Sequence, residues 1–311
     1  MFGGLRHCTA AARTVAQTLA TILLAFGPAH AADLAITPGC MLPAGPVRAV
    51  TRVLDGDTLQ LDDGSELRLI GALAPHAGDA GADAGAWPPA EAAQRTLSDL
   101  VLGRSLALAF GGLRTDRYGR WLAHAVVETE GRKDWVQGTM LARGMARAYA
   151  LTDNAACITD LMDRERPARE GKLGLWANAA YQIRSADNAR DLMAYRHTFQ
   201  LVKGRITTIS NTRGAMYLNF AQDRRGFAVV MKRASHALPI GTSPEGLAGR
   251  TALVRGWIDR RNGPVIAIDT AGQIELLDSP DAVGSLQRAA PRRHDRAQKR
   301  TVPGGRAAGH E

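Results

Sequence analysis

The chain has 311 residues, with 39 Lys and Arg against 30 Asp and Glu, which gives a formal net charge of +9. This length is sufficient for about two domains. Beyond the N-terminal region no segment is apolar enough to cross a bilayer, and the eight histidines show no zinc-binding spacing. The sequence also lacks a recognisable Ser/His/Asp or Cys/His nucleophile set and a glycine-rich phosphate loop, which excludes the enzyme classes that depend on them.

The N-terminal segment has the order of features that is typical of a secretory signal. Arg6 and Arg13 precede an apolar run over residues 15–26, and small residues follow up to Ala31. We therefore predict export to the periplasm or the exterior, with cleavage after Ala31. Loss of residues 1–31 removes two arginines and no acids, so the net charge falls from +9 to +7. The alternative is a retained membrane anchor, for which the apolar run is short.

The cysteines suggest one cross-link. Cys8 lies in the predicted signal, so Cys40 and Cys157 remain as a pair. In an oxidising compartment we expect them to form a disulfide that ties an N-terminal arm to a helix. The alternative is two unpaired thiols.

Residues 50–71 predict a β-hairpin that carries polar side chains. Apolar residues alternate along two runs, and the Asp-Asp-Gly-Ser sequence at residues 62–65 is typical of the turn between them. A glycine between Asp55 and Asp57 predicts a kink in the first strand, which brings the two carboxylates close together. With Arg68 on the neighbouring strand, these acids form a candidate site for a cation and a phosphate.

The segments that follow this hairpin predict a small barrel covered by helices. A glycine-rich stretch at residues 77–85 is expected to be a mobile loop, and a helix is expected to start at Pro88 and end at Gly103. Strands are predicted over residues 105–110 and 121–127, and helices over residues 136–145 and 154–172. The sequence shows no repeated strand–helix–strand unit, so this order favours a β-barrel over a Rossmann sheet.

A second pattern of short strands begins after a polar connection. Alternating residues and glycine turns predict about five strands in a second small barrel. The predicted fold class is therefore β-rich α+β, with two small barrels. The predicted organisation is a signal at 1–31, an arm at 32–47, a first domain at 48–178, a linker at 179–197, a second barrel at 198–278 and a disordered basic tail at 279–311.

The second barrel interleaves charged and aromatic residues, as proteins that bind single strands do on an exposed barrel face. The candidate substrate-binding residues are Arg213, Tyr217 and Arg225, with Arg224, Phe227 and Lys232 in the same pattern. The alternative is a solvated face over an ordinary core. The basic tail could add phosphate contacts that weaken with salt, or it could tether an acidic partner or surface.

Further motifs follow the first hairpin in a fixed order. They are Tyr-Gly-Arg at residues 118–120, Trp-Val-Gln at 135–137, Leu-Ala-Arg-Gly-Met-Ala at 141–146 and Gly-Leu-Trp at 174–176. Together with the hairpin they resemble the staphylococcal-nuclease (thermonuclease) family over roughly residues 46–178. The resemblance implies an OB-like barrel that hydrolyses DNA or RNA. It also implies a calcium ion held by two carboxylates and a carbonyl, two arginines on the phosphate, and a glutamate that activates water.

The resemblance assigns a role to each matching residue. It makes Asp57 the first calcium carboxylate and Asp55 the neighbouring acid, Arg68 and Arg120 the phosphate arginines, and Tyr118 a residue near the substrate phosphate. The alternative for the two arginines is a surface ion pair with Asp55, Asp57 or Asp116. These roles agree with the chemistry of the side chains, since a guanidinium binds two phosphate oxygens and a hard cation prefers carboxylate oxygen. The second barrel resembles, more weakly, the OB-like domain of some secreted thermonuclease-like proteins.

The sequence departs from the family at residues 73–76, which read Leu-Ala-Pro-His. Leu73 stands where the second calcium carboxylate is expected and cannot bind a cation, although the Ala74 carbonyl still can. His76 replaces the glutamate, and it either acts as a base near neutral pH or is simply solvated. Candidate replacement ligands, or merely solvated acids, are Asp79, Asp83 and Glu91. We therefore expect calcium to be weakly bound or absent.

Three hypotheses follow. The first is an exported thermonuclease-like phosphodiesterase, weakened by loss of the usual base and of one calcium ligand. The second is a catalytically inactive nucleic-acid-binding protein of the cell envelope, and the third is an envelope adaptor that binds protein. For the first two hypotheses we expect a monomer whose partner is single-stranded DNA or RNA. We also expect no membrane span after the signal is cleaved.

Overall fold

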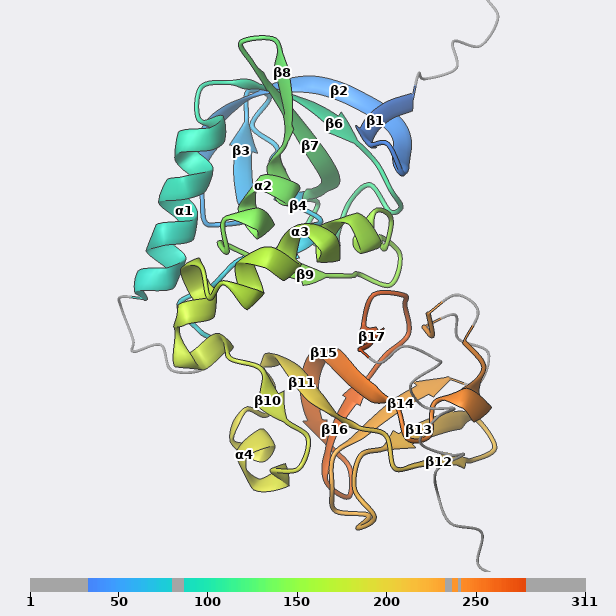
Figure 1. Ribbon diagram of the computed structural model, residues 1–311. Helices are drawn as coiled ribbons and strands as arrows, with labels where there is room; N and C mark the ends of the chain where they lie inside the picture. The colour runs from blue at the N-terminus through green and yellow to red at the C-terminus, as the bar shows by residue number, and fades with distance from the viewer. Residues whose placement is uncertain (1–32, 80–86, 233–236, 240–241, 278–311) are drawn as a thin grey trace, which may run out of the picture. The chain divides into compact units, whose positions relative to one another are not determined.

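The computed structural model describes residues 33–79, 87–232, 237–239 and 242–277 (Figure 1). The predicted signal at 1–31, the loop residues 80–85 and the predicted tail at 279–311 lie outside the described residues. Strands predominate over helices in the described part, which confirms the β-rich α+β class. Of the helices described, none is long and apolar enough to span a membrane.

The first barrel is closed by five strands. Its sheet runs in the order β2-β3-β4-β7-β6, and β6 pairs back onto β2. Neighbouring strands are antiparallel except β4 and β7, which are parallel. Alternate apolar residues point inward, so that Leu59, Leu67 and Leu108 are fully buried. The strands are β2 (Cys40–Val53), β3 (Thr58–Leu61), β4 (Glu66–Leu69), β6 (Ser105–Ala109) and β7 (Trp121–Thr129).

Short strands and helices surround this barrel. β1 (Asp33–Thr37) pairs with β2, β8 (Arg132–Trp135) pairs with β7, and β5 (Gly71–Leu73) pairs with β9 (Arg147–Tyr149) in a separate sheet. The helices are α1 (Pro88–Val101), α2 (Val136–Ala142), α3 (Ile158–Glu170) and the short η1 (Gly174–Ala177). The predicted apolar stripe of α1, from Ala93 to Val101, is buried. The structure thus has the predicted barrel with covering helices.

Two features of the N-terminal part differ from the predictions. The predicted arm at 32–47 is a β1–β2 hairpin, and Val47 pairs with Ala107 as part of the barrel wall. The predicted kink at 55–57 is a turn that reverses the chain between antiparallel β2 and β3. The first difference arises because β2 pairs both with β1 and with β6, which lies far along the chain.

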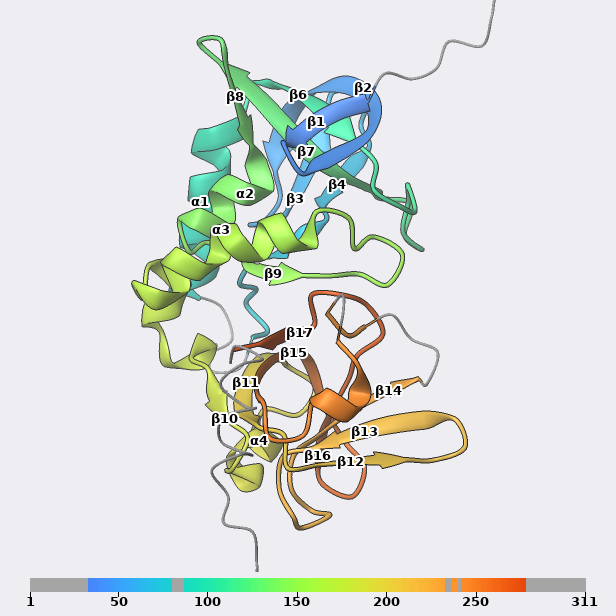
Figure 2. The same cartoon turned by 45° about the vertical axis from the view of Figure 1, so that its right-hand side comes forward.

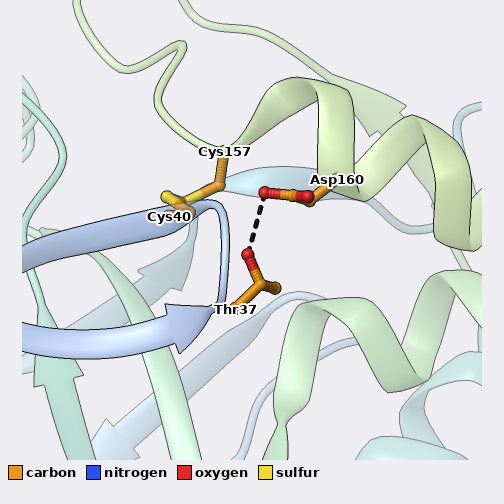
Figure 3. Close-up of a disulfide and its surroundings, with 4 residues drawn as sticks. All are labelled: Thr37, Cys40, Cys157 and Asp160. Atoms are coloured by element: carbon orange, nitrogen blue, oxygen red, sulfur yellow. Dashed lines mark hydrogen bonds between the residues drawn. A yellow bond between two sulfur atoms is a disulfide. The ribbon is translucent and has the colours of Figure 1, made fainter.

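Cys40 and Cys157 form a disulfide between the start of β2 and the N-terminal end of α3 (Figure 3). Their Cα atoms are 5.5 Å apart, within the usual range for a disulfide. Beside the bridge, Thr37 Oγ1 donates a hydrogen bond to Asp160 Oδ2 at 2.9 Å. The disulfide therefore fastens the N-terminal hairpin to the helix that carries Glu165.

The second barrel is a sheet in the order β10-β11-β15-β16-β14-β13-β12, with β17 paired to β15. β14 and β16 are parallel, as β4 and β7 are in the first barrel. Figure 2 shows β12 and β13 as a hairpin. The strands are β11 (Phe199–Arg205), β12 (Thr208–Asn211), β13 (Ala215–Asn219), β14 (Ala228–Lys232), β15 (Thr251–Arg260), β16 (Pro264–Ala267) and β17 (Ile274–Leu276).

Part of the predicted linker at 179–197 packs with the second barrel. It contains η2 (Ala179–Tyr181), β10 (Arg184–Ser185) and α4 (Ala189–Ala194), while η3 (Pro244–Gly246) lies later in the chain. β10 pairs with β11, and Ala186 and Leu192 are buried in the second core. The stretch is polar in sequence because only these few side chains face inward.

The two barrels contact each other through buried side chains. One apolar cluster joins Leu73 and Trp176 of the first barrel to Phe199 of the second. Beside it, Arg255 Nη1 of β15 donates to Glu165 Oε2 of α3 at 2.8 Å, and both side chains are at most 1% exposed. The second barrel is therefore anchored to the first rather than tethered by a free linker.

His124, in the middle of β7, makes the stability of the first barrel depend on pH. Its side chain is fully buried against Trp135, and burial lowers its pKa to about 4 from the ordinary 6.5. As the pH falls from 6.5 to 4, the unfolded chain binds a proton that the folded chain rejects, so the free energy of unfolding should fall by about 3 kcal/mol.

Urea denaturation at a series of pH values measures this loss. His124→Phe removes the titrating group, so the variant should show a smaller decline in unfolding free energy over the same pH range than the wild type. Equal declines in the two proteins would contradict the assignment.

Candidate active site in the first barrel

Residues 55–57 form a tight turn that positions two carboxylates. Leu54 N donates to Thr58 O at 2.9 Å, and Asp57 N donates to Asp55 Oδ1 at 2.8 Å. A Cβ atom on Gly56 would lie 2.6 Å from Ala74 Cβ and 2.8 Å from Ala93 Cβ, so only glycine allows this close approach. The turn is thus wedged against α1 and the segment after β5, which gives both acids a rigid support.

The carboxylate of Asp57 is fully buried and surrounded by donors. Ala74 N donates to Asp57 Oδ2 at 3.0 Å, and Thr58 Oγ1 donates to Asp57 Oδ1 at 3.2 Å. His76 Nε2 lies 3.4 Å from Asp57 Oδ2, within ion-pair distance. The structure therefore brings Asp55, Asp57, Ala74 and His76 together, and the donors of Ala74 and His76 face the Asp57 carboxylate.

The electrostatics of this group favour a charged Asp57–His76 pair. Burial raises the pKa of Asp57, but the hydrogen bond from His76 and the charge of Arg68 outweigh it, so the pKa is lowered overall. The contact with Asp57 raises the pKa of His76 despite the opposing effect of burial. Burial and the neighbouring Asp57 charge raise the pKa of Asp55. A deprotonated Asp57 thus stabilises an imidazolium on His76.

Sequence reasoning missed the cluster that holds the segment after His76. Tyr181 Oη donates to Asp79 Oδ2 at 2.6 Å, and Arg147 Nη2 donates to the same oxygen at 3.3 Å. Trp87 Nε1 in turn donates to Tyr181 Oη at 2.7 Å. These residues are far apart in the chain and form no local pattern, so no sequence signal could have grouped them.

The cluster also connects this segment to the second barrel. Arg147, only 3% exposed, donates from Nη1 to the Phe199 carbonyl at 2.8 Å. Asp79, which the sequence offered as a solvated acid or a replacement ligand, is therefore bound by protein donors. Glu91 lies on the surface of α1 and pairs with Arg95 at 3.5 Å, and Asp83 lies outside the described residues.

The two predicted phosphate arginines differ in their partners. The half-buried Arg68 makes no hydrogen bond or ion pair within the described residues, although its charge acts on Asp57. Arg120 is held by Asp116, with Nη2 and Nε at 2.7 and 2.8 Å from Oδ2. Tyr118 is 68% exposed, and the Arg120 guanidinium lies 5.5 Å from its ring centroid. Arg68 is therefore the more available of the two guanidinium groups.

The two arginines lie at neighbouring strands. Arg68 is on β4, and Arg120 directly precedes β7, in which Leu122 pairs in register with Arg68. This pairing brings the backbone of Arg120 within two residues of the partner of Arg68. The Asp116 ion pair fixes the Arg120 side chain and occupies one edge of its guanidinium, leaving Nη1 for another ligand.

The predicted binding residues of the second barrel differ in how exposed their side chains are. Tyr217 is half-buried and accepts a hydrogen bond on Oη from Arg261 Nη1 at 2.7 Å. Arg213 and Arg225 are exposed. Phe227 is 1% exposed in the second core, so its predicted place on an exposed face is wrong. It directly precedes β14, and its ring packs against Phe220 in the second core.

Part of the first barrel and its covering helices match a known protein family. Residues 66–178 match a family described as Staphylococcal nuclease homologue. The chain contains a thermonuclease-like domain. No curated protein matches the chain. The family match ends at the predicted boundary at 178 and includes Arg68, His76 and Arg120, while the turn at 55–57 precedes it.

The thermonuclease family generally uses calcium, but the residues of this domain do not fit the ion. Leu73, at the place of the second carboxylate, is 4% exposed and packs in the cluster with Trp176 and Phe199. The Asp57 oxygens already accept from protein donors, and His76 brings positive charge beside them. Among the described residues no three His, Cys, Asp or Glu side chains are placed to hold a metal.

Proposed function

We propose that the thermonuclease-like domain hydrolyses phosphodiester bonds of nucleic acid without a calcium ion, and that His76 is the base. The observation that carries this proposal is the His76–Asp57 contact at 3.4 Å, in which a buried carboxylate orients an imidazole that keeps 36% of its side chain exposed. With Nε2–H directed at Asp57, a neutral His76 has Nδ1 as its proton acceptor.

The reaction would use the remaining groups as follows. Water gives a proton to His76 Nδ1 as its oxygen forms a bond to phosphorus and the ester P–O bond on the opposite side breaks. The leaving oxygen takes up a proton from solvent, and the imidazolium of His76 releases its proton to solvent, so that His76 returns to the neutral form. Arg68, which has no partner in the described part of the chain, stabilises the charge on the phosphate, and Arg120 adds its free Nη1.

The first test is cleavage of labelled single-stranded DNA and RNA by the purified chain, in calcium or in excess chelator. We expect the same rate in both, because no step needs the ion. Arg68→Ala should slow cleavage by about 10²-fold, the usual effect of losing one group that stabilises the transition state. Arg52→Ala removes the same charge from an exposed site on β2 and is the matched control.

A second candidate function is nucleic-acid binding without hydrolysis. The burial of Leu73 in the apolar cluster favours it, because the family's second calcium ligand is replaced by a packing residue that the second barrel covers. A gel-shift with the same strands separates the two functions. Binding that depends on Arg68, without cleavage in either condition, would establish the second candidate. Cleavage abolished by chelator would contradict the metal-free mechanism.

Export is part of the proposal. The Cys40–Cys157 disulfide supports an oxidising compartment, such as the periplasm or the exterior, because disulfides rarely persist in a reducing cytosol. Nucleic acid from the surroundings would then be the substrate.

A further inference from the structure

A cavity of about 530 Å³ lies on the second barrel, away from the Asp57–His76 pair. It is bounded by the β12–β13 hairpin, by the loop between β13 and β14, and by the turn between β15 and β16. Its volume is within the range of sites that bind small molecules. None of the residues assigned to the first barrel lines it.

The floor of the cavity is one face of the hairpin. Thr208 pairs with Asn219 and Ser210 pairs with Tyr217 across the strands. Because alternate residues share a face, this side of the hairpin carries hydroxyl and amide groups, while Met216 and Leu218 turn into the core. Packing of Met216 and Leu218 in the core does not by itself account for the hydroxyl and amide groups on the opposite face of the hairpin.

Side-chain hydrogen bonds hold this floor in one arrangement. Asn219 Nδ2 donates to Thr208 Oγ1 at 3.2 Å and to Ser210 Oγ at 3.1 Å. Hydroxyl oxygens keep further capacity as donors and acceptors, and the Asn219 carbonyl oxygen is an acceptor. The floor can therefore hydrogen-bond the edge of a planar polar group without first being rearranged.

Tyr217 adds an aromatic ring to this face, and two arginines add positive charge. Arg261 Nη1 donates to Tyr217 Oη at 2.7 Å, and its guanidinium lies 5.9 Å from the ring centroid, which fixes the ring in place. Arg224 lines the opposite loop and makes no hydrogen bond or ion pair within the described residues. Asp223 also lines the cavity, with Oδ1 accepting from Arg225 N at 3.0 Å.

The charge around the cavity favours an anionic ligand. Residues 211–226 and 259–262 contain five arginines and two aspartates. A neutral sugar would use the ring and the hydroxyls but would leave the arginines without a role. A nucleotide uses all three features, since its base stacks on an aromatic ring, its base edge hydrogen-bonds, and its phosphate binds a guanidinium.

We propose that this cavity binds one nucleotide unit of a single-stranded DNA or RNA, with the base against Tyr217 and a phosphate at Arg224. The proposal rests on the proposed function in one respect, that nucleic acid is the partner of the chain. It adds a second contact point for the strand, on a barrel that the thermonuclease match does not include. Duplex DNA, whose bases are stacked on each other, does not offer a free base to the ring.

The test is fluorescence anisotropy of the full chain with labelled oligothymidylate and oligouridylate, with a duplex as comparison. Tyr217→Ala should weaken binding of both single strands about ten-fold or more, as loss of one stacked base does. Tyr217→Phe keeps the ring and should retain most of the affinity. Arg224→Ala should reduce the slope of log affinity against log salt by about 0.7.

Arg190→Ala is the matched control, because Arg190 is an exposed arginine on α4 of the same barrel and does not line the cavity. It should change neither the affinity nor the salt slope. Wild-type affinity in Tyr217→Ala, equal binding of duplex and single strands, or an effect of Arg190→Ala as large as that of Arg224→Ala would each overturn the proposal.

A second measurement separates this proposal from the proposed function. Hydrolysis of bis(p-nitrophenyl) phosphate, which is too small to reach both barrels, reports on the first barrel alone. If the wild type hydrolyses this ester but binds no oligonucleotide, the cavity proposal fails and the hydrolytic function stands. If Tyr217→Ala weakens oligonucleotide binding while the wild type hydrolyses nothing, the cavity proposal stands and hydrolysis fails.

Discussion

Replacing His76 with alanine is expected to slow phosphodiester hydrolysis by about 10²–10⁴-fold, the usual contribution of a positioned general base. The expectation follows from the Asp57 contact, which leaves the other ring nitrogen of His76 to accept a proton. His76 is active only when neutral, and its pKa is raised, so the wild-type rate should decline as the pH falls through that raised pKa. The rate left in His76→Ala should lack this decline.

The comparison needs a control that alters charge near the site without touching Asp57. Glu91→Ala meets this need, since Glu91 is exposed on α1 and pairs only with Arg95 in the described part of the chain. It should retain the wild-type rate and pH profile. Initial rates with bis(p-nitrophenyl) phosphate across neutral pH measure both effects. A His76→Ala protein with the wild-type rate and profile would remove His76 from the mechanism.

Replacing Arg255 with methionine is expected to lower the free energy of unfolding by about 3–5 kcal/mol, because it leaves a buried carboxylate with too few partners. Glu165 is fully buried, and Arg255 Nη1 is its nearest donor at 2.8 Å. The same nitrogen donates to the Ala148 carbonyl at 3.1 Å, which would also lose its donor. Arg169 remains at 3.3 Å from Glu165 and offsets part of the cost.

The matched control for this change is Arg132→Met. Arg132 pairs with Asp134 at 3.0 Å, but its side chain is 79% exposed, so the loss should be below about 1 kcal/mol. Urea denaturation at neutral pH compares the two variants. Equal losses would mean that the Arg255–Glu165 pair contributes no more than a surface ion pair, and that other contacts hold the barrels together.

Local sequence patterns were sufficient for much of the fold. The alternation along residues 58–69 predicted β3 and β4, and the apolar stripe from Ala93 to Val101 predicted the buried face of α1. The same alternation placed Met216 and Leu218 on one face of β13 and Tyr217 on the other. These predictions succeed because strand and helix periods are properties of neighbouring residues. The order of short motifs likewise identified the thermonuclease-like domain, since that signal is sequential.

The state of the candidate site depended on contacts between distant residues. The sequence showed that Leu73 cannot serve as a calcium ligand. Only the structure shows that its side chain packs against Trp176 and Phe199 in an apolar cluster. Asp79 read as a solvated acid, yet Arg147 and Tyr181 hold it.

By itself, then, the sequence determined the class of fold, the covering helices and the residues from which a phosphate site could be made. The tertiary structure decided which of them meet, because burial and hydrogen bonding depend on partners that are separated by as many as 123 residues and that no local period can pair.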